Sequence, residues 1–133
     1  MGCDIHLHQE VKINGKWEHY GIADVGRNYQ LFAKMAGVRG DEAPIVEPRG
    51  YPADVTTVTQ FNATDWGRDA HTPSWLGAEE IAELFEWLNE PGEVRPRERF
   101  GWLFGNCWDS FTKYPEDRPT GLEDIRFVFW FDN

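Results

Sequence analysis

The stretch CDIHLHQEVKINGKWEHYGIA, residues 3–23, decides the fold because two alternating runs of apolar and polar residues flank Asn14-Gly15. Asn-Gly is the dipeptide that a two-residue turn between antiparallel strands prefers, since both positions need a positive φ. Residues 3–12 and 16–23 are therefore predicted to form a β-hairpin.

The first strand of this hairpin has one chemically distinctive face. Because side chains alternate along a strand, Asp4, His6 and His8 share one side, and Ile5 and Leu7 share the other. The apolar side is expected to face the core. The acid and the two imidazoles then mark the opposite side as the candidate site.

The register expected for a two-residue turn sets the neighbours of these histidines. It places His8 opposite Gly21 and His6 opposite Ala23. Such small neighbours leave room over the imidazoles. That room suits a ligand, and it equally suits a helix packed over the sheet.

The rest of the chain predicts a mixture of helices, loops and one further strand. Residues 28–36 are expected to form a helix capped by Asn28 and stopped by Gly37, and 78–89 form the strongest amphipathic helix. Residues 40–54 and 66–75 are predicted to be loops, while 55–61 are ambiguous and 100–114 resist assignment. The final run, 125–131, is apolar on both faces and predicts an interior strand.

Together these elements predict one compact α+β domain over residues 1–133. In it the N-terminal β-hairpin and the C-terminal strand share one sheet, which packs against two or three helices. The chain has 133 residues, and 15% of them are aromatic, which is enough to build a substantial core.

Net charge and cysteine content narrow the function classes. The formal net charge of −10 disfavours general binding to DNA or RNA, because the phosphate backbone is repelled at long range. No leader is recognised before the fold and no run approaches the length of a membrane span. A cytoplasmic location is therefore expected, with no membrane partner and with Cys3 and Cys107 as reduced thiols.

Three long motifs resemble a family of small proteins from bacteriophage and prophage genomes. They are MGCDIH at the N-terminus, RNYQLFAKMAGVR with PRGYP and WGRDAHTPSWL in the middle, and YPEDRPTGLEDIRFVFWFDN at the end. The resemblance covers both termini and most of the chain. It implies an accessory role in an infected or lysogenic host, such as an antagonist of host defence that sequesters a signal molecule or inhibits a host protein.

The histidines also suggest a metal site. His6 and His8 could converge on one Zn²⁺ or Mn²⁺ ion, with Asp69 and His71 completing the ligand set. The chain would then be a metal-dependent hydrolase, with Asp4 or Asp69 as the general base. The simpler interpretation is that the histidines are hydrogen-bonded beneath a helix.

A second constellation suggests an anion site. Arg27 and Tyr29 flank the expected start of the first helix, where free backbone N–H groups favour an anion, and Arg49 lies in a Pro-Arg-Gly turn. Tryptophans near such arginines could stack on a nucleotide base. The simpler alternative is that each arginine pairs with one of the 23 acidic residues.

These observations lead to one preferred function and two alternatives. The preferred function is the binding of a small anionic, nucleotide-like ligand by a set of eight residues: Asp4, His6, His8, Arg27, Tyr29, Arg49, Asp69 and His71. The alternatives are the metal-dependent hydrolase and an acidic inhibitor of a host protein. Whether the chain forms a homo-oligomer stays open.

Overall fold

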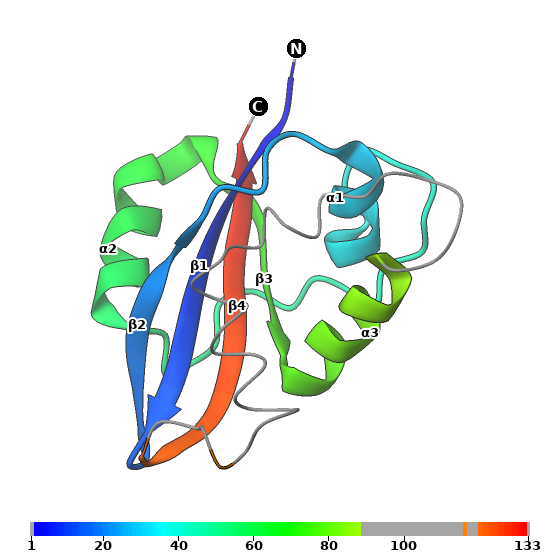
Figure 1. The fold of residues 1–133 in the computed structure, drawn as a ribbon. Helices are drawn as coiled ribbons and strands as arrows, with labels where there is room; N and C mark the ends of the chain where they lie inside the picture. The colour runs from blue at the N-terminus through cyan, green and yellow to red at the C-terminus, as the bar shows by residue number, and fades with distance from the viewer. Residues whose placement is uncertain (1, 89–115, 117–119, 133) are drawn as a thin grey trace.

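The described part of the chain is built on one four-stranded antiparallel sheet, seen in the computed structural model of Figure 1. The structure describes residues 2–88, 116 and 120–132. The strands are β1 (Asp4–Ile13), β2 (Lys16–Ala23), β3 (His71–Gly77) and β4 (Leu122–Asp132), in the order β2-β1-β4-β3. The predicted hairpin is thus confirmed, and β4 is an interior strand, also as predicted.

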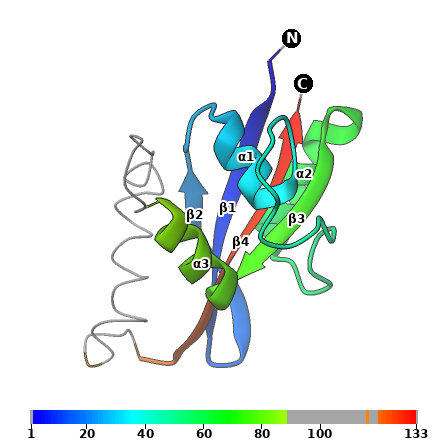
Figure 2. The same ribbon diagram turned by 90° about the vertical axis from the view of Figure 1, so that its right-hand side faces the viewer.

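Within the described residues, three helices cover the sheet from two sides. α1 (Tyr29–Ala36) and α3 (Ala78–Leu88) lie over one face, and α2 (Thr57–Trp66) lies over the other. Figure 1 shows α2 on one side of the sheet and α1 and α3 on the other, and in Figure 2 α1 and α3 lie in front of the sheet. A 3₁₀ turn, η1 (Gly67–Asp69), leads from α2 into β3. No helix in the described part of the chain has the length and apolar character needed to cross a membrane.

The hydrophobic core lies between the sheet and the pair α1 and α3. Alternate residues of β4 enter it, and helix residues such as Phe32 and Leu84 close it from outside. Phe127, Phe129 and Phe131 are fully buried there. The α2 side is different, because its buried residues include His8, Glu10 and Arg126. The sheet therefore has an apolar face and a polar face.

The helix predictions at 28–36 and 78–89 are confirmed, including the cap of α1. The Asn28 side chain accepts a hydrogen bond from the Leu31 backbone N–H at 3.0 Å, and Gly37 ends the helix with φ of 71°. The ambiguous segment 55–61 belongs largely to α2. The prediction of a loop at 66–75 was wrong, since this segment contains the end of α2, η1 and most of β3. Residues 100–114 lie outside the described part.

The predicted register of the hairpin holds only near its turn. Pairs run as predicted from Ile13 with Lys16 to Glu10 with His19, and a β-bulge between Gln9 and Glu10 then shifts the strands by one residue. His8 consequently faces Ile22 rather than Gly21. The expectation of small residues beside the histidines was therefore wrong, because a bulge leaves one residue of β2 without a counterpart.

Candidate functional site

The candidate site lies at the end of the sheet where β1 begins and β4 and α2 end (Figure 1). Asp4 is the cross-strand neighbour of Asp132, and His6 is the neighbour of Trp130. Two carboxylates directly opposite one another repel unless each has a cationic or hydrogen-bonding partner. Both have one here, because Asp4 binds Arg27 and Asp132 binds His6.

His6 is bound to Asp132 and contacts two indole rings. Its Nε2 makes a short hydrogen bond to the Asp132 carboxylate. Its ring centroid is 4.2 Å from that of Trp66 on α2 and 5.6 Å from that of Trp130 on β4. The His6 side chain keeps 23% of its surface exposed. Its Nδ1 has no partner within the described residues, so it can exchange a hydrogen bond with a ligand.

Arg27 forms a two-pronged pair with Asp4. Its Nε and Nη2 each donate to one Asp4 oxygen at 3.0 Å, and this hydrogen bonding lowers the pKa of Asp4. Both side chains are about half exposed. The Arg27 Nη1 is not engaged by Asp4 and lies against Gly2, where any Cβ would collide with it. The absence of a side chain at residue 2 thus lets the guanidinium lie close to the backbone.

Tyr29 has a structural duty at this end of the sheet. Its hydroxyl accepts a hydrogen bond from the Cys3 backbone N–H at 3.1 Å, which ties the start of β1 to α1. Cys3 itself is fully buried, and burial raises the pKa of its thiol. A buried thiol with a raised pKa is a poor nucleophile, so Cys3 serves packing rather than chemistry.

His8 lies deeper under α2 and is 1% exposed. Its Nδ1 is 2.8 Å from Nε2 of His19, and its Nε2 is 3.0 Å from Oδ1 of Asn62. Burial is the main cause that lowers the pKa of both histidines, which favours neutral rings that share hydrogen bonds. Both ring nitrogens of His8 are therefore already engaged. This matches the simpler prediction of histidines hydrogen-bonded beneath a helix.

His71 does not join His6 and His8. Its ring stacks on Phe131 with centroids 6.1 Å apart, and Phe131 packs against Phe32 of α1. His71 therefore lies on the α1 side of the sheet, whereas His6 and His8 lie on the α2 side. The expectation of one pocket shared by the three histidines is not met, because neighbouring β4 residues point to opposite faces.

Asp69 and Arg49 lie in different parts of the structure. Asp69 is in η1, which follows Trp66 directly, so it lies on the same end of the sheet as His6. Arg49 lies beside the edge strand β3, where it donates to Glu80 at 2.6 Å and stacks over the Trp75 ring at 3.5 Å. The structure thus brings together Asp4, His6 and Arg27 and assigns Arg49 to an ion pair of its own.

A buried ionic cluster on the same polar face was missed in the sequence. Glu10 is fully buried and accepts hydrogen bonds from Arg126 at 2.7 Å and from the backbone N–H of Thr56, the N-cap of α2, at 3.0 Å. Its alternation with His6 and His8 was the available signal for Glu10. Arg126 stood inside an apolar run and gave a weaker one. Trp66 and Asp132 were also missed as neighbours of His6.

The metal hypothesis gains no ligand set from this geometry. Among the described residues, no three His, Cys, Asp or Glu side chains converge as metal ligands. His6 and His8 are each committed to a different partner, Asp132 and the pair His19 and Asn62. What the site offers instead is a hydrogen-bonding imidazole, a half-buried indole and an exposed guanidinium.

Comparisons of the chain with protein-family models, with curated proteins and with solved structures give no match.

Proposed function

We propose that the protein captures a small ligand with a planar group and an anionic group at the His6 site, which comprises Asp4, His6, Arg27, Trp66 and Asp132. The observation that carries the proposal is the partly exposed His6, fixed by Asp132 against Trp66 with Nδ1 uncommitted among the described residues. A ring held so firmly presents a hydrogen-bonding atom at a defined position, which lowers the entropy cost of binding.

The neighbouring groups suit the two parts of such a ligand. Trp66 is half-buried and its indole can stack on a planar base, an interaction worth about 1–3 kcal/mol. Arg27 keeps Nη1 for an anionic group, and exposed Arg68 follows α2 with no carboxylate partner in the described part of the chain. The Asp4 and Asp132 carboxylates are already paired with Arg27 and His6, so they repel an anion less than unpaired carboxylates would.

Capture is favoured over turnover because each of these groups can bind a ligand without a nucleophile or a bond-breaking step. The resemblance to phage proteins suggests a purpose, namely the sequestration of a host signal molecule. A nucleotide-like ligand combines the planar group and the anionic group that the site would accept.

The proposal is tested by titrating the protein with purine and pyrimidine nucleotides, linear and cyclic, while tryptophan fluorescence and heat are recorded. Trp66→Leu and Arg27→Gln are each expected to weaken binding about 5- to 150-fold, since each removes about 1–3 kcal/mol. Arg49→Gln is the matched control, because it removes an arginine outside the site.

The nucleotide should be recovered unchanged after heat release. Conversion of the nucleotide would indicate an enzyme instead. Equal affinity in all three variants, or no binding of any nucleotide tested, would contradict the proposed site.

A further inference from the structure

The edge strand β2 and the helix α2 border a second, unrelated surface. β2 pairs with β1 on one side, and no described strand pairs with its other side. The backbone groups along such an edge can accept another strand, which is why edge strands are normally shielded. The bulge opposite Gln9 and Glu10 gives partial shielding of this kind.

Contacts fix which side of α2 faces the open edge of β2. Thr59, Asn62 and Trp66 point toward β1, where they meet Glu10, His8 and His6. Val58, Phe61 and Asp65 each precede one of these residues in the sequence. They are spaced by three and four residues, so they share a different side of the helix. Val58 lines a groove together with residues 16–19 of β2, which places this side toward β2.

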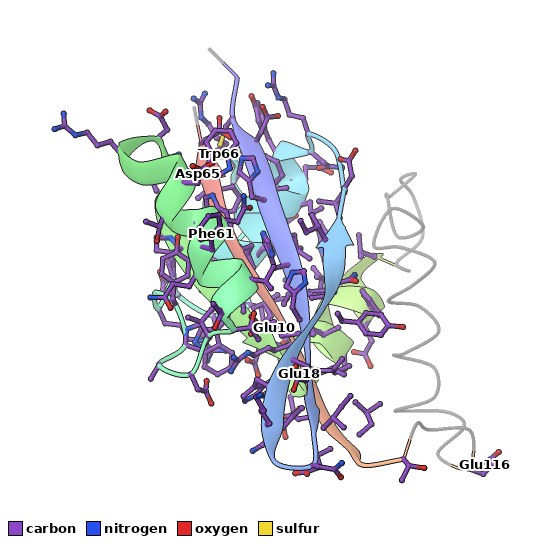
Figure 3. All side chains as sticks on the ribbon, turned by 90° about the vertical axis from the view of Figure 1, so that its left-hand side faces the viewer. Glu10, Glu18, Phe61, Asp65, Trp66 and Glu116 are labelled. Atoms are coloured by element: carbon purple, nitrogen blue, oxygen red, sulfur yellow. The ribbon has the colours of Figure 1, made fainter. Side chains whose placement is uncertain are left out.

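Large apolar side chains are left in solvent along this border. Phe61 is 77% exposed, Ile22 is 62% exposed and Val58 is 52% exposed. Figure 3 shows Phe61 and Asp65 on α2 with Glu18 on β2 below them. The groove between the two elements has a volume of about 550 Å³. We call the set Glu18, Ile22, Val58, Phe61 and Asp65, with this groove, the β2–α2 surface.

Charge indicates which occupant this surface suits. Two copies of a chain with net charge −10 repel each other, and Glu18 and Asp65 add acids at the surface itself. The only described ion pair of Glu18, to Lys16 at 3.8 Å, is solvent-exposed and therefore weak. A basic partner is attracted by the same charges that disfavour a second copy.

We propose that the β2–α2 surface binds an extended, lysine- or arginine-rich segment of another protein, which adds a strand to the edge of β2. Strand addition obtains affinity from the backbone and specificity from alternate side chains. Here one set of side chains would contact Ile22, Val58 and Phe61 on the α2 side. The alternate, basic side chains would lie on the opposite side near Glu18, whose strand partner Val11 faces that side. None of these residues belongs to the His6 site, so such binding is independent of the proposed function and goes beyond it.

The experiment uses a synthetic nonapeptide of alternating lysine and valine with the full-length protein. Hydrogen exchange measured by NMR should show new protection of β2 amides in residues 17–22, and calorimetry should give an affinity that falls as salt is raised from about 50 to about 300 mM. Phe61→Ser should weaken binding by at least about fivefold, as expected for a central apolar contact.

Three controls separate strand addition from general attraction to an acidic protein. Glu18→Gln should weaken binding, whereas Glu83→Gln on α3 removes an equal charge outside the β2–α2 surface and should not. A peptide N-methylated along one edge keeps its charge but cannot pair, so it should not protect β2. A glutamate–valine peptide should not bind.

Several outcomes would overturn the proposal. They are the absence of binding, equal binding of the N-methylated peptide, and binding without protection of β2. Self-association of the protein that is abolished by Phe61→Ser would also overturn it, because the occupant would then be a second copy. Melting curves of the variants verify that they fold, as expected for changes at exposed positions.

Discussion

Removal of the Glu10 carboxylate should destabilise the protein more than any comparable change on the polar face of the sheet. Glu10 is fully buried, and the Arg126 side chain is only 4% exposed. One Glu10 oxygen accepts from Arg126 at 2.7 Å. The other accepts from the Thr56 N–H at 3.0 Å and from the hydroxyls of Thr56 at 2.5 Å and Thr59 at 2.7 Å.

The magnitude follows from what Glu10→Ala leaves behind. Removing one member of a buried ion pair costs about 3–5 kcal/mol because the other charge stays buried. Asp54 still binds Arg126 at 2.8 Å, which moves the ionic part toward the lower end of that range. The N-cap amide of α2 also loses its acceptor, at about 1 kcal/mol. We expect the free energy of unfolding to fall by about 3–4 kcal/mol.

Urea unfolding at about pH 7.5, followed by circular dichroism and tryptophan fluorescence, measures this change. The double variant Glu10→Leu with Arg126→Met is the decisive comparison. It removes both charges and fills the space with apolar groups, so it should be more stable than Glu10→Ala alone. A loss below about 1 kcal/mol for Glu10→Ala, or a double variant whose cost equals the sum of two large single losses, would refute the reasoning.

Three further predictions test other parts of the structure. Burial lowers the pKa of His8 and His19, so the unfolded chain binds more protons than the folded one once the pH falls below about 6.5. The free energy of unfolding should therefore be flat above about pH 7 and should decline at lower pH by up to about 1.4 kcal/mol per pH unit per histidine. Urea titrations from about pH 7.5 to about pH 5 measure this decline. An unchanged stability at about pH 5.5 would contradict the buried histidine pair. Gly37→Ala should lower the free energy of unfolding by about 1 kcal/mol, because residue 37 has a positive φ of 71°. The control Thr64→Ala, on the exposed side of α2, should lower it by less than about 0.5 kcal/mol. Phe129→Ala should cost about 3–5 kcal/mol, measured by thermal and urea unfolding, because Phe129 is fully buried in the core; a smaller loss would indicate that the core can collapse around the gap.

The parts of the fold that the sequence predicted are those with local determinants. Asn14 and Gly15 adopt φ of 51° and 81°, as the Asn-Gly pair requires in a tight hairpin. Asn28 and Gly37 bound α1 by their own side chain and backbone preferences. The bulge in β1 and β2 has no such local signature, because it depends on how the two strands pack. One inserted residue was enough to change the neighbour of His8 from Gly21 to Ile22.

The residues of the candidate site show the same difference between local and long-range determinants. Asp4 and His6 could be placed on one strand face by alternation alone, and Arg27 was marked by its position before α1. Asp132 and Trp66 become partners of His6 only through the pairing of β1 with β4 and the docking of α2. His71 could not be assigned to a face, because the segment 66–75 was not recognised as containing a strand.

The helix α2 shows most clearly why sequence periodicity has a physical limit. Amphipathic patterns reveal helices that dock on an apolar surface, as α3 does with Ile81, Leu84 and Phe85. α2 docks on a polar surface, so its inward residues are Thr59 and Asn62, which satisfy buried groups of β1 that would otherwise lack partners. Its apolar Phe61 points outward instead. A helix that packs on a layer of histidine, glutamate and arginine therefore has polar residues on its inward side and apolar residues on its outward side, the reverse of the usual amphipathic pattern. A buried polar layer costs stability that an apolar layer would not, so its groups need the hydrogen-bond partners that Thr59 and Asn62 supply.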